Sequence, residues 1–147
     1  MAASKNVKLY IHSMIWNLNE SGEREGSAEI SDEEYGASLI SDGVRAAVSY
    51  SRDTEGGRIA SEIVFEKDSV TVKNKGAVLS VMVFSPNGTY EGVYSIPPYS
   101  FDMRIAVKAM RSSVTPSGCD ANILYTMAIG GAEKSCSMKI SVCEDNI

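Results

Sequence analysis

Several features that would point to an enzyme or a membrane protein are scarce in this chain or lacking from it. The only histidine is His12, so a Ser-His-Asp triad would have to be built around this one residue. The three cysteines, Cys119, Cys136 and Cys143, include no CxxC pair, which favours reduced thiols over a disulfide framework or a structural zinc site. No stretch reaches the roughly 18 consecutive apolar residues of a membrane helix, and no glycine-rich phosphate loop precedes a helix. We therefore expect no catalytic residues, no metal and no cofactor.

The charged residues indicate which partners and which cellular location to expect. Fourteen basic and nineteen acidic residues give a net charge of −5, and a surface of that sign repels phosphate backbones. The first segment carries Lys5 and Lys8 where an apolar signal core would lie, which argues against secretion. The sequence thus predicts a cytoplasmic protein whose partners include neither a nucleic acid nor a membrane.

What the chain has instead is a succession of strand patterns with little helical periodicity. Alternating apolar runs are separated by tight-turn residues, namely Asp42-Gly43, Pro86-Asn87-Gly88, Thr115-Pro116-Ser117-Gly118 and Gly130-Gly131. Antiparallel neighbours joined by such short turns close readily into a barrel. We therefore predict an all-β fold, a single domain over residues 1–147, built as an antiparallel meander barrel of about 8–10 strands. A β-sandwich is the alternative.

Three local expectations can be compared with the structure. Residues 7–18 are expected to form a first strand, in which the apolar face changes near His12-Ser13 and indicates a bulge or a bend. Residues 19–31 are polar, which predicts a solvated loop or an insertion. Residues 78–84 are apolar at every position but one, which predicts a strand covered on both faces or a dimer interface.

One segment resembles a known family. The run from Lys75-Gly76-Ala77 through Met82-Val83-Phe84, followed by Gly88, Tyr94 and Pro98-Tyr99-Ser100-Phe101, is similar to the signature of the YwiB-like family of small bacterial proteins. The resemblance implies a calycin-like or lipocalin-like β-barrel. Because the family has no established activity, the resemblance implies nothing about chemistry.

The parity of the apolar residues identifies side chains that should point into the barrel. They include five of the seven tyrosines, and buried hydroxyls need partners, which one another, water or a ligand can supply. Arg111 shares its parity with Met103, Ile105, Val107 and Ala109, so it should end an inward row, where an arginine can hold a carboxylate. The plain alternative is that Arg111 reaches solvent at the rim. The predicted inward tyrosines are Tyr35, Tyr50, Tyr90, Tyr94 and Tyr125, accompanied by Asn74 and Ser80.

These patterns favour a non-enzymatic barrel that binds a small apolar or carboxylate-bearing ligand in its interior. The candidate ligand-binding residues are Arg111, Tyr90, Tyr94, Tyr125, Tyr50 and Asn74. The alternative is a solid barrel without a ligand that acts through its surface, as an interaction module or as a homodimer.

Overall fold

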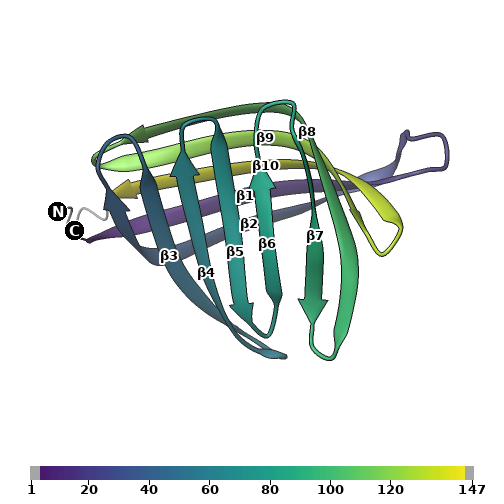
Figure 1. The fold of residues 1–147 in the computed structure, drawn as a ribbon, viewed down its shortest axis with the longest axis horizontal. Helices are drawn as coiled ribbons and strands as arrows, with labels where there is room; N and C mark the ends of the chain where they lie inside the picture. The colour runs from purple at the N-terminus through teal and green to yellow at the C-terminus, as the bar shows by residue number, and fades with distance from the viewer. Residues whose placement is uncertain (1–3, 145–147) are drawn as a thin grey trace.

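The computed structural model describes residues 4–144, and these form one closed antiparallel barrel without a helix (Figure 1). Each strand pairs with its neighbours along the chain, and the first pairs with the last, Leu9 opposite Val142. The predicted meander barrel is thus confirmed, and the sandwich alternative is wrong. The ten strands are β1 (Lys5–Leu18), β2 (Arg24–Ser41), β3 (Ala46–Thr54), β4 (Gly57–Glu66), β5 (Ser69–Gly76), β6 (Leu79–Phe84), β7 (Thr89–Ile96), β8 (Tyr99–Thr115), β9 (Gly118–Ile129) and β10 (Ala132–Glu144).

The turns gather at two ends of the barrel. The terminal end, towards the left and top in Figure 1, holds the start of β1, the end of β10 and the turns at residues 42–45, 67–68, 85–88 and 116–117. The hairpin end holds the turns at 19–23, 55–56, 77–78, 97–98 and 130–131. The predicted turn residues all lie in or beside these turns, and positive φ angles occur at Gly43, Asn87, Gly130 and Gly131 as tight turns require.

A packed apolar layer fills the barrel towards the terminal end. Its largest members, Phe65 and Phe84, have 0% of their surface exposed, and so do Leu9, Val48 and Ile105. Phe84 meets Tyr125 edge to face, with ring centroids 4.9 Å apart. These side chains come from strands on all sides of the barrel, so burying them stabilises the closed shape as a whole.

Two local expectations for the first hairpin are wrong. Ile11 and Ile15 still pack on the core with the parity of Leu9, so the inward face does not change at His12-Ser13. The irregularity lies later, between Ile15 and Asn17 in the pairing with β2. The expected loop over residues 19–31 is only the turn at 19–23, because Arg24–Ser31 continue as the start of β2. The hairpin of β1 and β2 projects beyond the rest of the barrel in Figure 1.

The expectation that residues 78–84 are covered on both faces is also wrong. Ser80, Met82 and Phe84 face inward, whereas Leu79 and Val81 on the outer face are 45% and 41% exposed. Within residues 4–144, no helix is long and apolar enough to cross a membrane.

Candidate functional site

The tyrosines predicted to face inward do so. Tyr35, Tyr50, Tyr90 and Tyr94 pack against the core while partly buried, and Tyr125 belongs to the core, 9% exposed. Burial raises the pKa of Tyr50 above its ordinary value, while the Ser61 hydroxyl and the charge of Arg52 act in the opposite direction. Burial raises the pKa of Tyr125 as well, and the neighbouring Cys136 adds to the shift. The phenols of Tyr50 and Tyr125 are therefore neutral donors and acceptors on the inner wall.

A row of hydrogen-bonded polar side chains crosses the inner wall from β4 to β6. Ser61 donates to Asn74 Oδ1 at 2.6 Å, and Asn74 Nδ2 donates to Ser80 Oγ at 3.0 Å. Ser61 and Ser80 are buried, 4% and 6% exposed. In the pairing register this row continues to Tyr50 on one side and Tyr94 on the other. The inner wall thus carries a belt of hydroxyl and amide groups beside the apolar layer.

Arg111 does not belong to this wall. The pairing of β8 with β9 shifts between Val107 and Ala109, so a bulge at Lys108 reverses the parity of everything that follows. Met110 packs on the core, whereas Arg111 is exposed. It lines a surface hollow of about 460 Å³ at the terminal end, together with Lys67 and Pro86. The prediction that Arg111 faces inward is therefore wrong.

Arg52 lies at an inward-facing position near the end of a strand, which is where Arg111 was expected to lie. It shares its parity on β3 with Val48 and Tyr50, and it lies opposite Ile59, which is 3% exposed. Its Nε atom is buried and has no hydrogen-bond partner among residues 4–144. Arg52 Nη1 lies 3.8 Å from Glu33 Oε2 on β2. Although burial opposes the charged form, the Tyr35 hydroxyl and Glu33 raise the pKa of Arg52, so the guanidinium stays charged.

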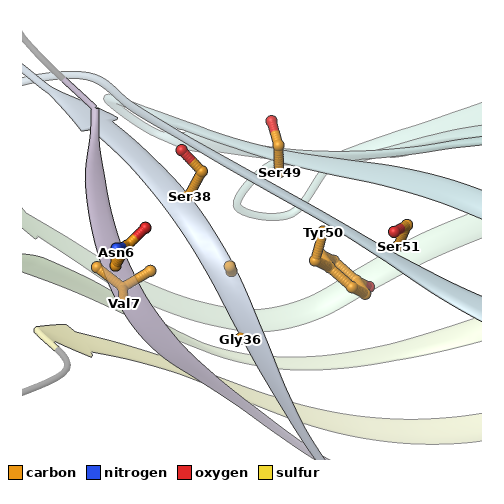
Figure 2. A pocket seen from close by; sticks show the side chains of 8 residues that line it. Asn6, Val7, Gly36, Ser38, Ser49, Tyr50 and Ser51 are labelled. Carbon is orange, nitrogen blue, oxygen red and sulfur yellow. The ribbon is translucent and has the colours of Figure 1, made fainter.

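Arg52 stands beside an opening in the barrel wall. β2 and β3 pair only from Ser38 opposite Ser49 to Ser41 opposite Ala46, and towards the hairpin end they separate. A hollow of about 630 Å³ lies at this separation, and Figure 2 shows Tyr50 on the opposite side of β3 from Ser49. The hollow is lined by Asn6, Val7, Gly36, Ala37, Ser38, Ser49, Tyr50 and Ser51.

Side chains replace the backbone pairing across this opening. The rings of Tyr35 on β2 and Tyr50 on β3 stack with centroids 4.9 Å apart and an angle of 29° between their planes. The Glu33–Arg52 pair spans the same two strands. Stacked rings and a loose ion pair can separate by changes of rotamer, whereas a ladder of backbone hydrogen bonds cannot.

Wholly buried side chains gather in the terminal half of the inner wall, here called the sealed half, and partly buried ones are more frequent in the hairpin half, here called the wet half. The division is not strict, since Met110 and Val114 at the terminal end are partly buried and Ile59 at the hairpin end is buried. In the sealed half, Leu9, Val48 and Phe65 are wholly buried. Towards the hairpin end, Ile15, Met127 and other inward-facing side chains are only partly buried although they pack on the core. Because these side chains face the lumen, water reaches the inner wall from the rim or through the opening. The hairpin half is therefore the less tightly enclosed part of the inner wall.

The single histidine lies outside the barrel. His12 Nδ1 is 2.5 Å from Asp32 Oδ1, and the two side chains are 41% and 75% exposed. Lys139 and Ser141 lie beside them around a surface hollow of about 500 Å³. Among the residues described, no group of three histidine, cysteine, aspartate or glutamate side chains is placed to hold a metal ion.

Sequence reasoning missed Arg52, Glu33 and Ser61. The signal for two of them was present, since Ser61 alternates with Ile59 and Ile63, and Arg52 continues the alternation of Ala46, Val48 and Tyr50. Glu33 was hidden, because it lies in the contiguous acidic run Asp32-Glu33-Glu34, which shows no alternation and suggests a solvated strand entry.

The three cysteines provide a direct check on which face is buried. Cys119 and Cys136 are buried and Cys143 is exposed, all three as free thiols. Burial raises the pKa of Cys119 from 9.0 to about 12. In the native protein at pH 8, we expect a water-soluble disulfide reagent to modify only Cys143, and the other two only after unfolding. Because the folded state favours the protonated Cys119, its contribution to stability is complete below pH 9 and is lost as the pH rises towards 12. Rapid reaction of three thiols per folded chain would contradict the burial of Cys119 and Cys136.

The fold and the site define a class: a closed ten-stranded antiparallel barrel with a polar belt and an arginine on its inner wall. The family model described as "Domain of unknown function (DUF1934)" matches residues 17–140. The chain therefore belongs to the DUF1934 family. It is also similar to the crystal structure of the YwiB protein from Bacillus subtilis, with a TM-score of 0.82 and 17% identity over 97% of this chain and 94% of that one. At this identity the likeness concerns the fold. No curated protein matches the chain.

Proposed function

We propose that this protein is a non-enzymatic barrel that binds a small, mainly apolar ligand in the hairpin half of its interior. The single observation that carries the proposal is the partial exposure of inward-facing side chains such as Tyr50, Tyr94 and Met127, next to a fully packed layer. Such a wall combines apolar area with a few fixed polar groups, which is typical of small-molecule sites. The polar belt of Ser61, Asn74 and Ser80 would orient the ligand. A calycin-like barrel and a cytoplasmic location are part of this proposal.

Native mass spectrometry of freshly purified protein, followed by titration with 1-decanol, tests the proposal. We expect a co-purifying mass or saturable binding of one decanol per chain. Met127→Trp places a large ring on the inner wall and should weaken decanol binding by about tenfold or more, since lost apolar contact and a blocked lumen both oppose binding.

Leu124→Trp is the matched control, because Leu124 lies on the same strand but is 47% exposed on the outer face. It should bind decanol as the unchanged protein does, and circular dichroism should report the same fold for both variants. A bare mass together with no decanol binding would contradict the proposed function, as would equal binding by the two variants.

The second candidate function is self-association through the outer face of β6 and β7. Leu79, Val81 and Val93 are 45%, 41% and 51% exposed on these neighbouring strands. The same native mass spectra measure the assembly state, and a dimer mass that Val81→Lys converts to monomer would favour this candidate.

A further inference from the structure

Arg52 stands at the one place along the described β2–β3 boundary where the wall is held by side chains. Its guanidinium reaches from β3 towards Glu33 of β2, and both side chains are 35% exposed. Arg52 is thus partly exposed and directly follows Ser51, which lines the hollow at the opening, while the strand that carries it lines the interior with Tyr50 and Val48.

The hydrogen-bonding capacity of Arg52 is not used up within the described residues. Its Nε–H is buried without a partner, a state that costs free energy comparable to a lost hydrogen bond. Glu33 approaches Nη1 at 3.8 Å, which is beyond hydrogen-bonding distance. The Tyr35 hydroxyl interacts with the guanidinium, but on the edge that includes Nε the Nε–H itself has no acceptor. A carboxylate presents two coplanar oxygens that match such an edge.

The surroundings favour a singly charged, amphiphilic ligand. Glu33 lies close enough to Arg52 to repel a second negative charge. Behind the guanidinium, Ile59 is buried opposite Arg52 and the aromatic rings of Tyr35 and Tyr50 stack across the opening. A charged head at the opening and a hydrocarbon tail along the inner wall would meet groups of the appropriate polarity.

We propose that a carboxylate headgroup binds at the opening between β2 and β3, where Arg52 holds it beside the Tyr35 hydroxyl and the aliphatic tail of the ligand lies inside the barrel. We call this binding site the carboxylate seat. This inference rests on the proposed function and adds the ligand class, an aliphatic monocarboxylate, together with the residue that recognises it. In the free protein, Glu33 forms a long ion pair with the Arg52 guanidinium, and the ligand carboxylate replaces Glu33 when it binds.

The test compares decanoate with 1-decanol, which share a ten-carbon chain and differ at the headgroup. We expect the unchanged protein to bind decanoate about tenfold more tightly than decanol, as a charge-assisted pair supplies. Arg52→Gln should abolish this preference while leaving decanol binding in place. Glu33→Gln should strengthen decanoate binding, because it removes the competing carboxylate. In ¹⁵N NMR spectra, decanoate should shift the Arg52 Nε–H resonance and decanol should not.

Arg111→Gln is the matched control, because Arg111 is exposed at the terminal end and should leave both affinities unchanged. Decanol binding by the Arg52 and Glu33 variants verifies that they are folded. Equal affinities for the two ligands would overturn the carboxylate seat and leave the proposed function standing. A preference for decanoate over decanol that survives in Arg52→Gln, or is lost in Arg111→Gln, would also overturn it. So would tighter binding of decyl phosphate than of decanoate, because the site is expected to favour a singly charged headgroup. Failure of the unchanged protein to bind either ligand would overturn both proposals.

Discussion

Gly76→Ala is expected to destabilise the barrel by about 2–4 kcal/mol, a large part of the stability of a domain of this size. Gly76 has a φ of +105°, a conformation that side chains disfavour. A methyl group there would lie 2.2 Å from the carbonyl oxygen of Arg58 on the neighbouring strand. Ala77 N donates a hydrogen bond to the same oxygen at 3.1 Å, so the carbonyl cannot move away without breaking that bond. Urea denaturation followed by far-ultraviolet circular dichroism measures the effect.

Two other glycines separate the steric clash from the backbone strain. Gly57 has a φ of +123°, but a methyl group there meets only the Ala77 Cβ at 3.6 Å, so Gly57→Ala reports the strain alone. At Gly36 the φ lies outside the positive region and nothing lies within 4 Å, so Gly36→Ala should change stability by about 0.5 kcal/mol or less. The expected order of destabilisation is Gly76, Gly57, Gly36. A Gly76→Ala protein as stable as Gly36→Ala would show that β4 and β5 do not approach one another as described.

This contact explains part of the family signature. Gly76-Ala77 opens the motif that carries the resemblance, and its glycine is required by the close approach of β4 at the end of β5. Other motif residues fill the interior, since Phe84 is wholly buried and Tyr94 packs on the core. At these positions the motif encodes the barrel, which is why it predicts the fold well and says little about function.

The sequence was most informative where local chemistry alone determines structure. The turn at Pro86-Asn87-Gly88 needs a residue that tolerates positive φ, and Asn87 adopts 56° there. The tyrosines were placed correctly because each lies in a strand whose inward parity is uninterrupted around it. Local alternation is sufficient in such strands.

The alternation of inward and outward side chains gave a wrong prediction where one extra residue interrupts it. From Met103 to Val107 the alternation of β8 is regular, and nothing in the sequence marks Lys108 as an inserted position. The bulge is fixed by pairing with β9, a tertiary effect, and it moves Arg111 from the expected interior to the surface. Arg52 lies on a strand whose pairing with β4 has no such shift, so the same reasoning applied to β3 finds the inward arginine.

The first half of β2 was missed for a different physical reason. Residues 24–31 are nearly all exposed, so no apolar alternation distinguishes this strand from a loop. It exists because it pairs with β1, with Leu18 opposite Arg24. The Arg24 guanidinium also lies 3.8 Å from the centroid of the Trp16 ring, a cation–π contact across the hairpin. A strand that is stabilised mainly by pairing with its partner strand, and not by burial, cannot be predicted from the alternation of apolar residues.

Phe84→Ala should destabilise the protein by about 3–5 kcal/mol, because it removes a ring from the layer that closes the interior. Phe84 is wholly buried, lies opposite the equally buried Val70, and meets Tyr125 edge to face. The cost combines the lost transfer of the ring from water with the cavity left behind. Urea denaturation of the unchanged protein and of Phe84→Ala gives the difference in their free energies of unfolding. If the dependence of that free energy on urea concentration is the same in both, the denatured state is unaffected.

Phe101→Ala is the matched control, since Phe101 is 42% exposed at the hairpin end and should cost about 1 kcal/mol or less. The contrast bears on the proposed function, in which the packed layer closes the interior on the terminal side of the ligand. If Phe84→Ala cost no more than Phe101→Ala, the layer would be loosely packed and the boundary between the sealed and the wet half would disappear. A large cost at Phe84 with a small one at Phe101 would show that a tightly packed layer lies on the terminal side of Arg52 and the polar belt.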